Sequence, residues 1–98
     1  MLITSLKNEH IKDLVKLKDK KTRDELGLFL VETKHLVIEA YRAGLIEELI
    51  LEQNEIFPND CKKITYVTKD ILKKLSSMES PSNVMAVVRK RKEAAEYG

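Results

Sequence analysis

The sequence is sparing with several residue types: among 98 residues it has one cysteine, three glycines, two prolines and no tryptophan. The single cysteine excludes an internal disulfide and is typical of a reducing compartment, so we expect a cytoplasmic location. The N-terminal stretch MLITSLKNEH lacks the continuous apolar segment of a signal peptide. No stretch approaches the roughly 20 apolar residues that a membrane span requires. We therefore expect a soluble chain that is not exported and has no membrane partner.

Motifs of catalysis and metal binding are also missing. The sequence has no Gly-rich phosphate loop, no paired cysteines, no H-E-x-x-H and no serine flanked by glycines as in a nucleophile elbow. His10 and His35 each fall in the first turn of an expected helix, which favours surface or half-buried roles. Cys61 lies in a polar stretch with no base beside it. We expect no catalytic residue, no metal ligand and no cofactor site in this chain.

What is present is enough apolar sequence for one domain and a pronounced charge asymmetry. Hydrophobic residues make up 43% of the chain, which supports a modest core, and the length leaves no room for a second domain. Residues 1–23 carry seven basic and three acidic side chains, residues 24–60 two and nine, and residues 61–98 nine and four. Basic ends around an acidic middle either solvate helix faces or face a polyanion such as RNA.

Hydrophobic periodicity predicts alternating helices and strands. Helical stripes and polar caps predict helices at residues 8–18, 33–44 and 68–77, and short apolar runs predict strands at residues 28–31, 46–51, 63–67 and 84–88. The polar stretch that ends at Gly27 is expected to be a loop or a short helical turn. Residues 52–63 are expected to be a loop, and the basic tail looks like an exit segment.

The pattern predicts an α/β fold, in which helices cover both faces of one small sheet. We expect a three-layer α/β/α sandwich around a mostly parallel sheet of four strands. The strand at residues 28–31 should be buried on both faces and should pair in parallel with the strand at 46–51, as in a βαβ unit. The wholly apolar strand at 84–88 is expected to be central.

A basic block precedes the first predicted strand and is the main candidate for a binding surface. Five cations on a solvent-exposed connection could track a nucleic-acid backbone: Lys16, Lys18, Lys20, Lys21 and Arg23. Asn8 could touch a base or a 2′-hydroxyl, although a capping role already explains it. Glu32 is expected to pair with Arg23 or to accept from the amides of the next helix, with a direct ligand role as the alternative. Aromatic residues are few and Phe29 falls in a core run, so recognition should depend on shape and phosphate.

Several ordered motifs resemble one protein family. They are I-T-S-L-K-N-x-x-I-K-x-L-x-K-L at residues 3–17, K-K-T-R at 20–23, F-L-V-E at 29–32, H-L-V-I-E-A at 35–40 and S-P-S-N-V-M-A-V-V at 80–88. In this order they resemble the N-terminal substrate-binding domain of SpoU/TrmH-type RNA 2′-O-ribose methyltransferases. The family commonly has Gly where this chain has Thr33 and Asn83.

The resemblance implies a fold similar to the small ribosomal proteins that bind kinked RNA, with RNA, often ribosomal, as the partner. It implies residues 1–90 as an RNA substrate-binding domain and residues 91–98 as the start of a linker to a catalytic domain absent from this chain. That second domain would bind S-adenosylmethionine, and the parent enzyme would be a homodimer.

Two further readings stay open at the sequence level. The chain could be a free-standing RNA-binding protein similar to ribosomal proteins. It could also be a dimerisation module in which an acidic surface meets a basic one. The acidic surface would consist of Glu47, Glu48, Glu52 and Glu55.

Overall fold

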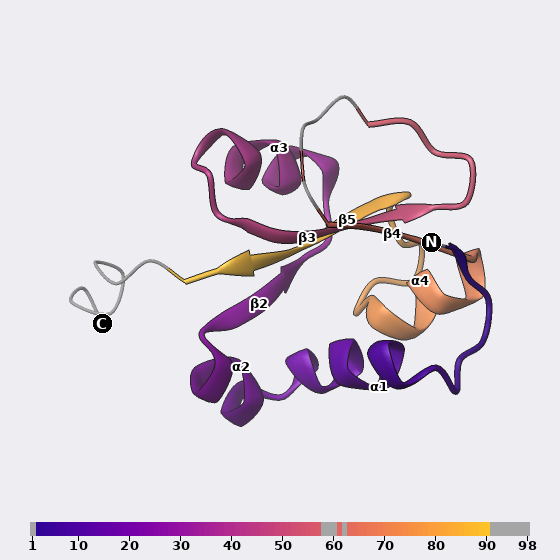
Figure 1. Ribbon diagram of the computed structural model, residues 1–98, viewed down its shortest axis with the longest axis horizontal. Helices are drawn as coiled ribbons and strands as arrows, with labels where there is room; N and C mark the ends of the chain where they lie inside the picture. The colour runs from indigo at the N-terminus through magenta and orange to yellow at the C-terminus, as the bar shows by residue number, and fades with distance from the viewer. Residues whose placement is uncertain (1, 58–60, 62, 91–98) are drawn as a thin grey trace.

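The computed structural model describes residues 2–57, 61 and 63–90. The elements in chain order are β1 (Leu2–Ile3), α1 (Glu9–Val15), a short 3₁₀ turn (Lys16–Lys18), α2 (Lys20–Leu26), β2 (Leu28–Val31), α3 (Lys34–Arg42), β3 (Ile46–Glu52), β4 (Ile64–Val67), α4 (Lys69–Leu75) and β5 (Val84–Arg89). The strands form one sheet in the order β1-β4-β3-β5-β2. α3 covers one face of the sheet, and α1, α2 and α4 cover the other (Figure 1).

The sheet is mixed, and one strand runs against the others. β4 pairs in parallel with both β1 and β3, whereas β5 pairs antiparallel with β3 and with β2. β1, β2, β3 and β4 therefore point in the same direction, and their carboxyl ends meet at the same edge of the sheet. The three-layer α/β/α fold predicted from the sequence is confirmed. The sheet has five strands instead of the expected four, and it is mixed instead of mostly parallel, since two of its four strand pairings are antiparallel.

Two hydrophobic cores lie on the two faces of the sheet. Alternating residues of the interior strands supply both, because successive side chains of a strand point to opposite faces. The core under α1 and α4 contains Ile3, Ile11, Leu14, Leu17, Ile50, Val67, Ile71, Leu72, Leu75, Met85 and Val87. The core under α3 contains Val31, Val37, Ala40, Leu49, Leu51, Phe57, Val84, Ala86 and Val88.

The polar caps predicted at Asn8 and Thr33 are confirmed, whereas Thr68 precedes α4 without a side-chain capping bond. Asn8 Oδ1 accepts from the amide of His10 at 2.8 Å and begins α1, and Thr33 Oγ1 accepts from the amide of Leu36 at 3.3 Å and begins α3. Gly27 and Gly44 follow α2 and α3 with φ near +70°, a conformation that glycine adopts at low cost. Asn83 does not share this conformation, since Asn54 is the only non-glycine residue with positive φ in the described part of the chain.

Three predictions about the elements were wrong. The polar stretch before Gly27 is a seven-residue helix, α2, which has no buried residue and therefore lacks the apolar stripe that periodicity detects. β1 was missed because it has two residues. β2 is an edge strand, half-buried except for Val31, and it does not pair with β3 because β5 lies between them. The predicted exit segment at 91–98, and part of the loop at 52–63, fall outside the described residues.

Leu49 tests the core under α3. Its side chain is fully buried, so replacing it with Ala should lower the free energy of unfolding by roughly 2–5 kcal/mol through lost burial and a residual cavity. Leu26→Ala is the control, because Leu26 is 59% exposed and its truncation should change stability by no more than about 0.5 kcal/mol. Urea denaturation of both variants gives the comparison, and equal losses would contradict the assigned packing.

Candidate nucleic-acid interface

The predicted basic block borders a hollow between the helical layer and the edge strand β2. This basic hollow has a volume of about 260 Å³. Its lining residues come from the 3₁₀ turn, α2, β2 and the end of α4: Leu17, Lys18, Arg23, Phe29, Leu30, Glu32, Leu75 and Ser77. Three of the predicted site residues, Lys18, Arg23 and Glu32, thus meet at one place. Phe29, which lines the hollow, is partly buried and packs against the core under α3.

The two cations of the hollow are held by backbone carbonyls. Arg23 Nη1 donates to the carbonyl oxygens of Leu17 at 3.1 Å and Lys18 at 2.8 Å, so it closes the C-terminal end of the 3₁₀ turn. Lys18 Nζ donates to the carbonyl oxygen of Lys74 at 2.8 Å. The prediction that Glu32 pairs with Arg23 is wrong, since Arg23 is oriented by the turn that precedes its own helix.

Glu32 instead anchors the connection between α4 and β5. Its carboxylate accepts from Ser76 Oγ at 2.7 Å, the Ser77 amide at 2.9 Å and Ser77 Oγ at 2.8 Å. Partial burial raises the pKa of Glu32, but these three bonds and the charge of Lys18 together outweigh it and hold the pKa below its usual value. These donors lie more than 40 residues away along the chain, so the prediction that the amides of α3 serve Glu32 is also wrong.

The fold brings the two basic ends of the sequence together. Lys18 reaches α4, and Lys90 after β5 donates to Asp24 Oδ1 of α2 at 2.7 Å. The bonds from Lys90 and Lys20 hold the pKa of Asp24 below its usual value. The exposed lysines of α4 therefore belong to the same side of the sheet as the basic block (Figure 1).

The other predicted site residues have different positions. Lys16 lies 3.8 Å from Asp13 and Lys20 lies 3.3 Å from Asp24, and both side chains are exposed. Lys21 is exposed and makes no hydrogen bond or ion pair with any described residue. Asn8 lies at the opposite end of α1 beside a separate cavity lined by Ile3, Asn8, His10, Lys63, Ile64 and Thr65. The structure therefore does not bring Asn8 to the basic hollow.

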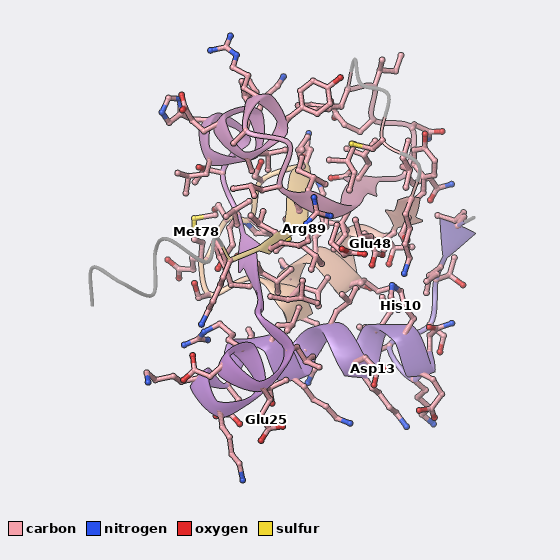
Figure 2. The ribbon with its side chains drawn as sticks, turned by 60° about the vertical axis from the view of Figure 1, so that its left-hand side comes forward. His10, Asp13, Glu25, Glu48, Met78 and Arg89 are labelled. Carbon is pink, nitrogen blue, oxygen red and sulfur yellow. The ribbon has the colours of Figure 1, made fainter. Side chains whose placement is uncertain are left out.

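Sequence reasoning missed a buried acidic residue beside that second cavity. Glu48 is 3% exposed and accepts from Thr65 Oγ1 at 2.6 Å and from His10 Nε2 at 2.7 Å. Lys63 Nζ lies 3.6 Å away. Figure 2 shows His10 reaching from α1 toward Glu48 in the sheet. The expectation that Glu48 lies on an exposed acidic surface is wrong. Its position directly before the apolar run 49–51 was the one sequence feature that could have indicated its burial.

Two kinds of site have no support in the described residues. No group of three or more His, Cys, Asp or Glu side chains there could hold a metal ion. Within the same residues, no helix is long and apolar enough to cross a membrane.

The family model of the MRM3-like substrate binding domain matches residues 8–86. This chain belongs to that family. The predicted resemblance to the substrate-binding domain of SpoU-type RNA methyltransferases is thereby confirmed.

Named relatives of this MRM3-like domain are larger proteins. It is 32% identical over 89 residues to the 23S rRNA (guanosine(2553)-2′-O)-methyltransferase RlmP of Bacillus subtilis (strain 168), covering 87% of this chain and 36% of that protein. A solved RNA 2′-O ribose methyltransferase superposes with a TM-score of 0.83 at 29% identity, covering 94% of this chain and 38% of that one. An rRNA methyltransferase from Sinorhizobium meliloti superposes with a TM-score of 0.76 at 25% identity, covering 93% and 37%. The domain thus spans little more than a third of each relative.

Glu32→Gln tests the anchor of the α4–β5 connection in this MRM3-like domain. Because the pKa of Glu32 is lowered in the folded chain, its carboxylate stabilises the fold above the unfolded pKa of about 4.3. That stabilisation is lost as the pH falls through the folded value. Glu32→Gln should lower the free energy of unfolding by roughly 1 kcal/mol at neutral pH, because solvent partly screens a group that is only partly buried. It should also make the free energy of unfolding fall less steeply as the pH is lowered.

Urea denaturation at a series of pH values between 3 and 7 checks this expectation. Glu39→Gln is the matched control, since Glu39 is an exposed residue on α3. If the acid limbs of Glu32→Gln and Glu39→Gln have the same slope, Glu32 is not the anchor described above.

Thr65→Val tests the buried Glu48. Valine keeps the shape of threonine but removes the hydroxyl that donates to the carboxylate, so the variant should lose roughly 1.5–3 kcal/mol of unfolding free energy. Thr65→Ser keeps the hydroxyl and should lose less. Thermal and urea unfolding rank the two, and a Val variant as stable as the wild type would contradict the contact.

Proposed function

We propose that this chain is the RNA-recognition domain of a 2′-O-ribose methyltransferase that acts on ribosomal RNA. The observation that carries the proposal is the family match over residues 8–86, together with relatives named as rRNA and RNA 2′-O-ribose methyltransferases. These names describe the relatives. The basic side chains that converge on one side of this chain support the same RNA-directed function for it.

In this proposal, RNA phosphates lie along the surface formed by the basic block and α4. Lys16, Lys20 and Lys21 are exposed and supply point charges to the backbone. Arg23 and Lys18 retain their bonds to carbonyl oxygens and contribute positive potential and shape at the hollow. Glu32 and Asn8 then act indirectly. Glu32 holds the α4–β5 connection that borders the surface, and Asn8 caps the start of α1.

The proposal places the chemistry in another part of a longer protein. Residues 1–90 form the RNA-binding domain and residues 91–98 begin a linker to a catalytic domain, in line with the share of each relative that this chain spans. S-adenosylmethionine would bind in that second domain, and an AdoMet-bound form of the S. meliloti relative supports this. The basic hollow does not suit the cofactor, because its cations repel a sulfonium and its one carboxylate is taken by Ser76 and Ser77. The parent enzyme would be a homodimer.

The dimerisation alternative depends on an acidic surface of four glutamates, and two of these glutamates are not free to meet a partner. Glu48 is buried, and Glu47 is engaged by Arg89, whose Nη1 lies 3.2 Å from its carboxylate. The RNA proposal is therefore preferred.

A lysine double variant tests the RNA surface. Lys20→Ala/Lys21→Ala removes two exposed cations and should lower the affinity for single-stranded RNA oligomers. It should also reduce the slope of log affinity against log salt by roughly 0.7 per lost phosphate contact. Fluorescence anisotropy at several salt concentrations gives the slope.

Lys34→Ala/Arg42→Ala is the matched control, because it removes the same charge from exposed positions on α3, which covers the opposite face of the sheet. The control should keep the wild-type slope. An unchanged slope in Lys20→Ala/Lys21→Ala would refute the assigned surface, and no RNA binding by the wild type would refute the proposed function.

A further inference from the structure

Another pocket, distinct from the cavity beside Asn8, lies at the same edge of the sheet as the basic hollow. This Glu52 pocket has a volume of about 280 Å³ and is lined by Glu52, Lys69, Leu72, Lys73, Glu79, Ser80, Pro81 and Asn83. Glu52 ends β3, and Lys69 begins α4 directly after β4. β3 and β4 are parallel, so the pocket sits outside the carboxyl ends of parallel strands, where ligands of α/β proteins commonly bind.

Glu52 has a polar atom that the fold leaves unsatisfied. Its Oε1 is buried and has no hydrogen-bond partner in the part of the chain that the structure describes. Both backbone groups of Glu52 are satisfied, since its amide donates to Asn83 O at 2.9 Å and its carbonyl oxygen accepts from the Glu55 amide at 2.9 Å. A buried acceptor without a donor is costly, so a native structure that keeps one calls for an explanation.

The lining of the pocket indicates what kind of donor would satisfy Glu52. Lys69 and Lys73 are one helical turn apart on α4, both exposed, and neither forms an ion pair with a described residue. Two carboxylates and two ammonium groups balance, so the pocket is not a simple anion site. Its lining combines the Glu52 carboxylate, the exposed cations Lys69 and Lys73, and the apolar side chains of Leu72 and Pro81. A nucleotide has this combination, with N–H donors on a flat base and a phosphate outside it.

The position of the Glu52 pocket also fits a single RNA strand. The basic hollow includes Ser77, and the Glu52 pocket includes Glu79 and Ser80 of the same connection between α4 and β5. Both sites border α4, through Leu75 in one and Leu72 in the other. A strand whose phosphates follow the basic hollow therefore passes the Glu52 pocket.

We propose that the Glu52 pocket binds one unstacked RNA base that carries a ring imino N–H, guanine or uracil, with Lys69 and Lys73 contacting the adjoining phosphates. The Glu52 carboxylate accepts from N1–H and N2–H of guanine or from N3–H of uracil. Adenine and cytosine can also donate to a carboxylate, through N6–H₂ and N4–H₂ respectively. They place a ring-nitrogen acceptor where guanine and uracil carry the imino N–H, however, so this acceptor faces the second carboxylate oxygen and binding is weaker. This inference rests on the proposed function and adds base selection to a surface that otherwise reads only phosphate.

The test compares base preference in the wild type and in Glu52→Gln. Two-dimensional NMR titrations use GMP, UMP, AMP and CMP as separate probes, which distinguishes guanine from uracil as the preferred base. We expect GMP or UMP to shift the amides of the pocket residues and to bind roughly fivefold or more tightly than AMP and CMP. Glu52→Gln should remove this preference, because an amide both donates and accepts, and Glu39→Gln should keep it.

A second variant separates the base contact from the phosphate contact. Lys69→Ala/Lys73→Ala should weaken binding of oligo(U) and oligo(A) by the same factor and reduce the salt slope, whereas Glu52→Gln should change only their ratio. If wild-type chain binds RNA with the salt dependence described above but Glu52→Gln leaves the base preference unchanged, this inference is wrong and the proposed function stands. If the wild type binds no RNA, both are wrong.

Discussion

β5 is the strand on which the rest of the structure depends. It lies between β3 and β2 and is the only described strand that runs against the other four. Its residues 84–88 are all buried, with Met85 and Val87 in one core and Val84, Ala86 and Val88 in the other. Ala86 stands opposite Val31 of β2 and Leu49 of β3. Without this strand β2 would have no partner, and Glu32 would not be held beside Ser76 and Ser77.

The carboxyl ends of the parallel strands carry two glutamates in contrasting environments. Glu32, directly after β2, accepts three hydrogen bonds from Ser76 and Ser77 and so ties the α4–β5 connection to the edge strand. Glu52, at the end of β3, keeps a buried oxygen for which the described residues provide no donor. The hydrogen-bonding needs of the first glutamate are met by the fold, and the second is the acceptor that we propose for an RNA base. The connection at residues 76–83 borders both, so a rigid Glu32 anchor also shapes the Glu52 pocket.

Buried and exposed charged side chains have different roles in this molecule. Glu48 has a histidine, a threonine and a lysine around it, as a buried carboxylate requires, and it joins α1 to β3 and β4. Lys20 and Lys21 remain in solvent, where a pair with Asp24 contributes little to stability and leaves the lysines available to phosphate. The acidic middle of the sequence is thus partly structural, whereas the basic ends supply the surface that we propose for RNA.

The sequence alone determined the layers, the caps at Asn8 and Thr33 and the burial of β5, because helical and strand periodicity and capping are local properties. It also proposed the basic block as a binding surface, which stays a prediction. Only the tertiary structure decided that β5 separates β2 from β3, that Glu32 binds serines 44 and 45 residues away, and that Glu48 is buried. Strand order and long-range hydrogen bonds join residues far apart in the chain, and a local pattern carries no information about which distant partner satisfies a polar group.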